Sequence, residues 1–351
     1  MVTLGVDAHK ASHTVVAVDD NGMQVGTTTV AATPAGHLVA LRWAESCFAH
    51  RRWALEDCRH LTRRLERDLL AAGEQVLRVP PKLMAGARRG GRVAGKSDPI
   101  DALAVARAAL REPGLPVARL EGQARELRLL VDHREDLVAE RTRLQNRLRW
   151  HLHDLDPELV IPPRALDRQH LLDTLERRFG TREGMVAGLA VQLVRHCREL
   201  TRSINDLERQ ITTRVTPLAP RLLALRGCGA LTAAKLIGET ADIRRFPTRS
   251  AFAMFNGTAP VPVWSGNPIR HRLNRGGNRQ LNAALHRILI TQLRDDGPAR
   301  AYVQRRTANG NTKTEAIRSL RRQLSNTVYQ RLLEDSPGHH HAPATGLEQA
   351  A

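Results

Sequence analysis

The order of β-rich and helical segments in the first 115 residues constrains the fold of this chain most strongly. Three runs rich in β-branched residues come first, with an Asp-Asn-Gly turn before the last: 2–6, 14–18 and 25–30. Helical patterns then alternate with short apolar strands: 34–49 (helix), 53–55 (strand), 59–72 (helix), 75–79 (strand) and 99–111 (helix). The order βββαβαβα is typical of a ribonuclease H-like α/β domain, which we expect at residues 1–115.

Two carboxylates end predicted strands of this domain, and two more stand at the start of its last helix. Asp7 closes the first strand, Glu56 follows the strand 53–55, and Asp98 and Asp101 lie three residues apart, on one helix face. Sheet domains place chemistry at strand ends, where four carboxylates would repel each other unless a cation neutralised them. Oxygen ligands in this number suit Mg²⁺ or Mn²⁺, and two such ions can polarise a phosphodiester.

Each of these carboxylates also has a purely structural interpretation. Asp98 before Pro99 is a favourable helix cap, and Asp101 would then interact well with the helix dipole. Asp57 stands next to Glu56 and could be the ligand in its place. From the residues alone, both interpretations stay open.

Zinc and disulfide chemistry are not indicated. The four cysteines lack paired short spacing, and His9 and His13, four apart in a strand and turn, predict surface or substrate contacts. The tail 336–351, with its three histidines, is expected to be disordered, and we assign it no function. No apolar run approaches the ~18 residues that span a bilayer, and the N-terminus lacks an apolar signal-peptide core, so we expect a cytoplasmic, nucleoid-associated bacterial protein.

An apolar repeat dominates the middle of the chain, residues 116–215. Leucines seven apart begin at Leu130, and a second series runs from Val186 to Leu218 in steps of three, four or seven. These patterns predict two long helices with a coiled-coil seam. The seam could join helices within one chain or form a dimerisation stalk.

Positive charge is concentrated in residues 216–335, which carry 20 Lys and Arg against 7 Asp and Glu. From Ile243 to Arg294 there is no acidic residue at all, which suits contact with a phosphate backbone. Aromatic residues are only 3% of the chain, so a stacking platform for single-stranded bases is not indicated. Arg far outnumbers Lys, as a GC-rich coding sequence would produce, but that bias does not explain the local absence of acids.

Two glycine-containing segments are further candidates for nucleic-acid contact. Residues 222–237 predict a helix, a tight turn at Gly227 and Gly229, and a second helix, as in a helix-hairpin-helix, although a plain helical turn fits as well. The acid-free run 75–97 predicts a flexible basic loop. From these two segments and the acid-free run 243–294, the candidate contacts with nucleic acid are Arg88, Arg89, Arg92, Lys96, Gly227, Gly229, Arg270, Arg272, Arg275 and Arg279.

Ser265 precedes a glycine at the edge of the most arginine-rich part of the acid-free run. Guanidinium groups neutralise a pentacovalent phosphate and favour attack by an alkoxide, so Ser265 is a candidate nucleophile for DNA. A simple turn is an equally reasonable explanation of a Ser-Gly pair. No Ser-His-Asp spacing or Gly-x-Ser-x-Gly elbow indicates a hydrolase instead.

Short motifs follow one another in a specific order along nearly the whole chain. They are Gly5-Val6-Asp7, Leu55-Glu56, Lys96-Ser97-Asp98-Pro99-Ile100-Asp101-Ala102, Leu225-Arg226-Gly227-Cys228-Gly229, Ile243-Arg244-Arg245-Phe246, and Ser265-Gly266 ahead of Gly276-Gly277-Asn278-Arg279. In this order and spacing the chain resembles the DEDD transposases of the insertion-sequence 110 family, which are RNA-guided recombinases.

The resemblance implies a RuvC-like catalytic domain at the N-terminus and a transposase domain at the C-terminus. In the first, Asp7, Glu56, Asp98 and Asp101 would hold Mg²⁺ (or Mn²⁺). In the second, Ser265 would attack DNA covalently. It further implies donor and target double-stranded DNA, a structured guide RNA encoded by the element, and a homo-oligomer, either a dimer or a dimer of dimers.

One position departs from the family pattern. Trp264 precedes the serine where a polar residue is more usual, which leaves Thr258 as the fallback nucleophile. Two other classes of function also stay open. One is a Holliday-junction nuclease that uses the same acids with water as nucleophile, and the other is a non-catalytic nucleic-acid scaffold.

Overall fold

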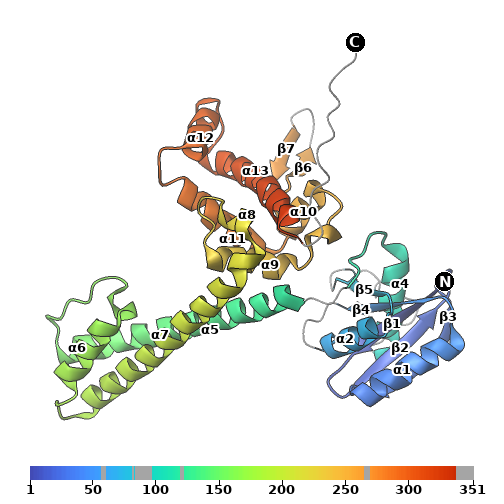
Figure 1. Cartoon of the computed structure of the whole chain (residues 1–351), viewed down its shortest axis with the longest axis horizontal. Coiled ribbons are helices and arrows are strands. Elements are labelled where there is room, and N and C mark those ends of the chain that lie inside the picture. The colour runs from blue at the N-terminus through green and yellow to red at the C-terminus, as the bar shows by residue number, and fades with distance from the viewer. Residues whose placement is uncertain (57–60, 81–82, 84–96, 119–121, 265–268, 337–351) are drawn as a thin grey trace. The chain divides into compact units, whose positions relative to one another are not determined.

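The computed structural model describes the chain except for residues 57–60, 81–82, 84–96, 119–121, 265–268 and 337–351 (Figure 1). The chain forms two compact units, Met1–Leu120 and Glu121–Ala351. Seven residues singled out from the sequence lie outside the described residues: Asp57, Arg88, Arg89, Arg92, Lys96, Ser265 and Gly266. Among the helices that are described, none is both long and apolar enough to cross a membrane.

The first unit is built on a five-stranded mixed sheet in the order β3-β2-β1-β4-β5. Strands β1 (Val2–Ala8), β2 (Ser12–Val18) and β3 (Gln24–Ala31) are antiparallel, whereas β4 (Arg51–Glu56) and β5 (Val76–Val79) continue from β1 in parallel. The predicted antiparallel start is therefore confirmed, and the sheet is that of a ribonuclease H-like domain.

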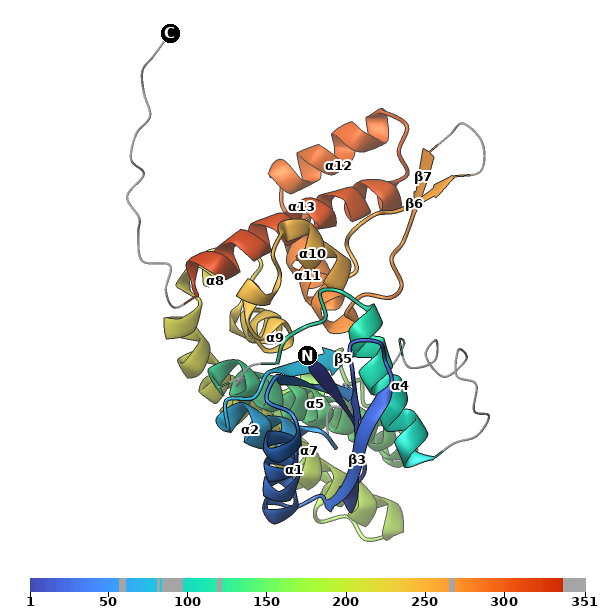
Figure 2. The same ribbon diagram turned by 90° about the vertical axis from the view of Figure 1, so that its right-hand side faces the viewer.

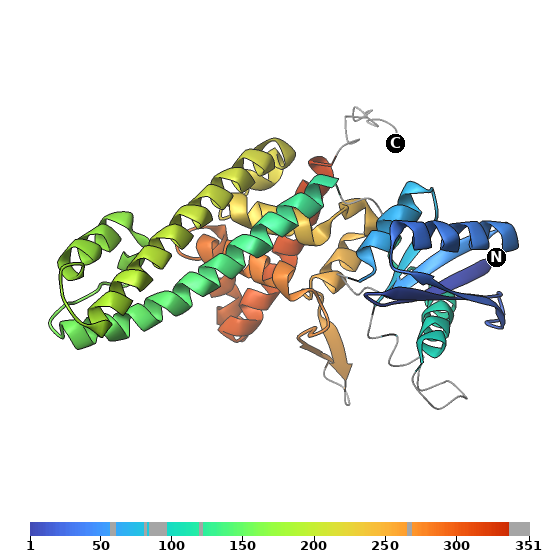
Figure 3. The ribbon, with the colours of Figure 1, turned by 90° about the horizontal axis from the view of Figure 1, so that it is seen from below.

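Helices cover both faces of this sheet (Figures 2 and 3). Helices α1 (Pro34–Cys47) and α2 (Arg63–Ala71) pack on the face that carries Val6 and Leu55, and α4 (Asp98–Arg111) packs on the other. Successive side chains of a strand point to opposite faces, so the alternation of apolar residues in β1 and β4 places a core on each side. Both faces are buried, as expected for parallel strands.

Helix α4 lies unusually close to β1 because Gly5 has no side chain. A Cβ atom at position 5 would lie 2.2 Å from the carbonyl oxygen of Ala102 and 2.4 Å from the amide nitrogen of Ala106. Ala102 and Ala106 have small side chains on the helix face toward β1, and both are fully buried. This small-residue contact brings the first turn of α4 alongside the end of β1.

Two buried histidines and an aspartate form a hydrogen-bonded chain between β2, α1 and α2. His13 and His37, each 1% exposed, stack with their Nε2 atoms 3.2 Å apart. The Nδ1 atom of His37 donates to a carboxylate oxygen of Asp68 at 2.6 Å, and the Nε2 atoms of the two rings share the next hydrogen bond of the chain. Burial, with the neighbouring His37 and His9, lowers the pKa of His13 to about 4. His13 is therefore uncharged in the folded protein at neutral pH.

We predict that the protein loses stability as the pH falls from 6.5 to about 4. Unfolded His13 takes up a proton near its ordinary pKa of 6.5, whereas the folded ring stays neutral down to about 4, so protonation favours unfolding by up to about 3 kcal/mol. Denaturant unfolding across this pH range measures the effect. His13→Gln, which cannot titrate, should flatten the dependence, and His50→Gln, at an exposed position of the same unit, should not. An equally steep dependence in His13→Gln would contradict the assignment.

Two long helices dominate the first half of the second unit (Figure 3). Helices α5 (Gly122–Leu155) and α7 (Met185–Leu218) pack side by side, and α6 (Gln169–Phe179) packs on α7. Leu127 near the start of α5 shares a buried cluster with Val215 near the end of α7, so the pair is antiparallel. The long helices predicted from the repeat are present and pack within one chain, while a coiled-coil seam as such stays a prediction.

Short helices and one hairpin complete the second unit (Figure 2). A short 3-10 helix, η1 (Ala165–Asp167), lies between α5 and α6. The elements after α7 are, in chain order, α8 (Pro220–Leu223), α9 (Ala230–Thr240), η2 (Ile243–Arg245), α10 (Arg249–Phe255), β6 (Val261–Trp264), β7 (Ile269–Arg272), α11 (Arg279–Gln292), α12 (Pro298–Ala308) and α13 (Lys313–Glu334). The strands β6 and β7 are antiparallel and form a two-stranded sheet of their own among the described residues.

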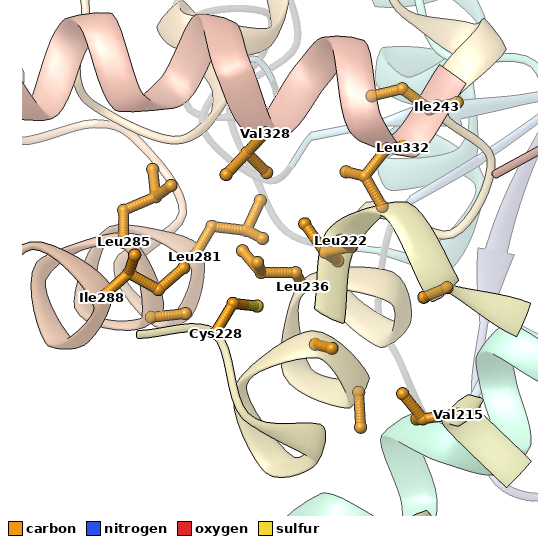
Figure 4. Close-up of a cluster of buried hydrophobic side chains, with 14 of the residues drawn as sticks. Val215, Leu222, Cys228, Leu236, Ile243, Leu281, Leu285, Ile288, Val328 and Leu332 are labelled. Atoms are coloured by element: carbon orange, nitrogen blue, oxygen red, sulfur yellow. The ribbon is translucent and has the colours of Figure 1, made fainter. Parts of the chain in front are cut away.

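One apolar core holds these helices to the ends of the long pair (Figure 4). Leu222 of α8, Leu236 of α9, Leu281 of α11 and Val328 of α13 are fully buried together with Val215 of α7. Because this core includes α7 as well as α13, the C-terminal helices are packed against the end of the long pair where α5 begins and α7 ends. The hairpin and the loops around it are thus carried by a well-packed helical body.

The predicted glycine turn lies between α8 and α9. Gly227 has a φ of 85°, and a Cβ there would lie 2.8 Å from the carbonyl oxygen of Ile288 in α11. Packing against α11 thus requires a glycine at this position. Gly229 precedes α9 and has open space where a side chain would project. Because α8 is a single four-residue turn, a helix-hairpin-helix in the strict sense stays a prediction.

Candidate active site

Two of the predicted carboxylates end neighbouring parallel strands. Val6 of β1 pairs with Leu55 of β4, so Asp7 and Glu56 are the next residues along the two strands, at their carboxyl ends. Val6 and Leu55 pack on the side of α1 and α2, and alternation turns Asp7 and Glu56 to the face covered by α4. The sheet therefore brings together two acids that lie 49 positions apart in the sequence.

The other two carboxylates are supplied by the first turn of α4. Ser97 has extended backbone angles and is the N-cap, while Asp98 is already helical. The interpretation of Asp98 as the helix cap is therefore wrong. Its carboxylate, half-exposed, still lies at the positive end of the helix dipole. Asp101, three residues after Asp98 in the same turn, is 6% exposed.

His9 joins Asp7 to Asp98. Its Nε2 atom lies 3.1 Å from an oxygen of Asp7 and 3.3 Å from an oxygen of Asp98, and one ligand atom from each of the three lies within 4.8 Å of the others. Among the described residues this is the group whose atoms are close enough to share one metal ion. Glu56 and Asp101 are not part of it, although Glu56 faces the same side of the sheet and the charge of Asp101 acts on Asp7.

The electrostatics of Asp7 favour a bound cation. Burial raises the pKa of its carboxyl, and the negative charges of Asp101 and Asp98 raise it further, against the opposing effect of His9. A carboxylate that is costly to ionise beside two others is stabilised when a divalent cation binds. The donor set, carboxylate oxygens with one imidazole, fits a hard divalent ion such as Mg²⁺ or Mn²⁺.

The basic candidates of the second unit surround the β6–β7 hairpin. Arg272 ends β7, Arg275 lies in the following loop, and Arg279 begins α11, all exposed. Asn278 caps α11 by accepting from two backbone amides of its first turn, and its own amide group donates to Glu239. The side chain of Arg270, like Ser265, lies outside the described residues.

Thr258, the fallback nucleophile, has a structural partner. Its hydroxyl donates to the side-chain oxygen of Asn256 at 2.7 Å, and its backbone amide donates to the same oxygen. Asn256 is fully buried and donates in turn to Ser325 of α13. These bonds hold the turn between α10 and β6, which accounts for Thr258 without catalysis.

Two features of these sites escaped the sequence interpretation. One is the position of His9 between two carboxylates, which depends on how closely α4 packs on β1. The other is a group of arginines on α13, Arg318, Arg321 and Arg322, that line a cavity beside the hairpin. Their spacing of i, i+3 and i+4 on a helix was a signal for a shared face.

Comparison with known proteins identifies the family. A DEDD transposase model of the IS110 type matches residues 4–157, and a model described as transposase IS116/IS110/IS902 family matches residues 219–304. An uncharacterised 43.6 kDa protein of insertion element IS110 from Streptomyces coelicolor is 31% identical over 64% of this chain and 67% of its own length. The chain belongs to the IS110 family of transposases. It is therefore a DNA recombinase, an enzyme whose substrate is DNA.

Other relatives match over more of the transposase. An uncharacterised 44.8 kDa protein of insertion element IS116 from Streptomyces clavuligerus is 29% identical over 94% of both chains. An uncharacterised 42 kDa protein of IS900 from Mycobacterium paratuberculosis is 25% identical over 98% of both. The structure of T. thermophilus RuvC in complex with a Holliday junction substrate aligns with 32% of this chain and 94% of its own, at 18% identity and a TM-score of 0.25.

We predict that Asp7→Asn has effects of opposite sign with and without divalent cations. In EDTA the variant should be more stable than wild type by roughly 0.5–2 kcal/mol, because the substitution removes a buried charge close to Asp98 and Asp101. Mg²⁺ or Mn²⁺ should raise the melting temperature of the wild type but not of the variant. Thermal unfolding measures both effects.

The matched control is Glu45→Gln, an exposed carboxylate on α1 of the same unit. It should leave the response to divalent cations intact. A wild-type protein that Mg²⁺ and Mn²⁺ do not stabilise, or an Asp7→Asn variant that responds as wild type does, would contradict the metal assignment.

Proposed function

We propose that this transposase cuts and rejoins DNA with Mg²⁺ held by Asp7, Glu56, Asp98 and Asp101 and with Ser265 as the nucleophile. The observation that carries the metal assignment is the grouping of Asp7, His9 and Asp98 within 4.8 Å at the edge where β1 meets α4. The raised pKa of Asp7 supports it, because a buried carboxylate among like charges is suited to a cation. The family supports the reaction class.

In the proposed reaction the hydroxyl of Ser265 loses its proton and its oxygen forms a bond to a backbone phosphorus. One bridging oxygen of the strand leaves and takes up a proton, so that a DNA end stays linked to the serine. Attack on that phosphorus by the hydroxyl of another strand frees the serine and rejoins the DNA. A divalent cation, when bound, would polarise the phosphate and stabilise the developing charge.

Cationic side chains around the hairpin would neutralise the same phosphate. Arg272, the last residue of β7, and Arg275 in the loop after it are exposed, with Arg270 and Arg279 as further candidates. Guanidinium groups bind phosphate through paired N–H donors and do not lose their charge. Gly227 and Gly229 are proposed as backbone contacts, supported by the open space at Gly229 before α9.

The remaining assignments are proposals about organisation and partners. We assign residues 1–115 to a RuvC-like catalytic domain, 116–215 to a helical spacer, 216–335 to DNA binding and the serine, and 336–351 to a tail. A structured guide RNA would be bound in part by the basic run with Arg88, Arg89, Arg92 and Lys96, and a homo-oligomer would pair donor with target DNA. The net charge of +18 supports a polyanionic partner.

Strand exchange should require both the carboxylates and the serine. We expect Asp7→Ala, Asp101→Asn and Ser265→Ala each to reduce recombination between donor and target DNA at least 100-fold, because each removes a group that acts on the reacting phosphate. Full activity in any one of them would remove that residue from the mechanism. Ser250→Ala, an exposed serine on α10, is the matched control and should remain active.

Trapping of protein on DNA separates the competing mechanisms. Denaturing gels should show an adduct with wild type and none with Ser265→Ala. Metal-dependent cutting without any adduct would instead favour a nuclease that uses water. If neither an adduct nor cutting occurs, the protein acts as a nucleic-acid scaffold.

RNA guidance has its own test. Protein purified from cells that carry the whole element should retain one defined RNA, and sequencing should match that RNA to the element itself. Replacing Arg88, Arg89, Arg92 and Lys96 together by Gln should reduce the retained RNA several-fold. A heterogeneous set of cellular RNAs, or equal retention by the variant, would contradict specific guide binding through this run.

A further inference from the structure

A strongly basic cavity of about 650 Å³ opens beside the base of the β6–β7 hairpin. Its walls come from the turn before β6, the end of β7, the end of α12 and one face of α13. Five arginines line it, Arg272, Arg306, Arg318, Arg321 and Arg322, together with His271. Three of these arginines come from α13, outside the acid-free run that marks the hairpin in the sequence.

The cavity contains almost no compensating negative charge. Glu315 is the one carboxylate in its lining, and it accepts hydrogen bonds from the backbone amide and hydroxyl of Thr312 in the capping box of α13. The ion pairs that the structure describes on α12 and α13, Arg300 with Asp296 and Arg331 with Glu334, involve arginines outside the cavity. Lys235, by contrast, is buried against both Asp132 and Glu135.

Neutral amide groups orient two of the arginines. Arg321 donates through Nη1 to the side-chain oxygen of Asn282 at 3.1 Å, and Asn282 is itself held by a bond to the backbone of Asn256. Arg322 donates to the side-chain oxygen of Asn326. An amide fixes the direction of a guanidinium without cancelling its charge, so each arginine remains available to an anion.

The arginines also repel each other. Burial lowers the pKa of Arg321 and the charge of Arg318 lowers it further, while burial and the charge of Arg249 lower the pKa of Arg322. The Nε atom of Arg306 is buried and has no hydrogen-bond partner among the described residues. Gathering cations in this way costs folding energy, and a bound anion with several acceptor oxygens would offset that cost.

We propose that this cavity binds a backbone phosphate of double-stranded DNA close to the phosphate that reacts. The choice of DNA rests on the proposed function. The hairpin runs three residues from the Val261–Arg272 pair at the cavity to the Trp264–Ile269 pair, roughly 10 Å at the rise of a strand. A DNA strand that followed the hairpin at a rise of about 3.4 Å per nucleotide would place the bound phosphate roughly three nucleotides from the end of the described hairpin. The cavity arginines are thus positioning residues that set the register of the strand.

Salt-dependent DNA binding tests this assignment without any reaction. Affinity for a duplex of fixed sequence is measured in EDTA over a range of salt concentrations. Arg318→Gln, which is exposed and does not threaten folding, and Arg321→Gln should each weaken binding about tenfold at one salt concentration. Each should also reduce the slope of log affinity against log salt by about 1, because one phosphate contact is lost. Arg318→Lys should restore most of the slope.

Arg331→Gln is the matched control, because Arg331 lies on the same helix but pairs with Glu334 outside the cavity. It should leave the slope unchanged. A wild-type slope in both Arg318→Gln and Arg321→Gln, or a reduced slope with an RNA duplex only, would overturn the proposal. A reduced slope with DNA supports the cavity even if Ser265→Ala remains active, so the two proposals can fail separately.

Discussion

The close contact between β1 and α4 is the constraint on which the candidate active site depends. With no side chain at Gly5, the backbone of α4 reaches the strand, and the first turn of the helix arrives beside the strand end that carries Asp7. Any side chain at position 5 would push the helix outward and separate Asp98 and Asp101 from the sheet. The approach of Asp98 to Asp7 thus depends on the absence of a Cβ atom two residues before Asp7.

Much of the first unit follows from local patterns in the sequence. The alternation of apolar residues and the Asp-Asn-Gly turn predict three antiparallel strands, and the structure confirms them. The role of Asp98 was harder to predict from the sequence. A carboxylate before proline is typical of an N-cap, yet Ser97 is the N-cap of α4. Capping preferences do not locate the start of a helix to within one residue. The place of His9 depends on packing between distant segments, which no local pattern contains.

The second unit shows what charge counting along a sequence can and cannot detect. The absence of acids between residues 243 and 294 correctly points to the hairpin region as basic. It misses Arg318, Arg321 and Arg322, because Glu315 and the acids at the end of α13 lie near them in sequence. In space, Glu315 is already engaged in a helix cap, and amide side chains contact the arginines. The net charge of a surface therefore depends on which partner each charged side chain has in the folded protein, and a count along the sequence does not contain that information.

The two units therefore contain opposite electrostatic imbalances. Asp7 is a buried acid among further acids, and the cavity on α13 gathers arginines without matching carboxylates. His9 offsets the first imbalance only in part, since the pKa of Asp7 stays raised. In the second, amide side chains orient Arg321 and Arg322, whereas Lys235 elsewhere in the unit is buried against two carboxylates. A divalent cation would neutralise the first cluster, and a backbone phosphate would neutralise the second. DNA with its associated cations would supply both partners. The two clusters lower the stability of the free protein, and this cost is explained if they serve DNA binding and catalysis.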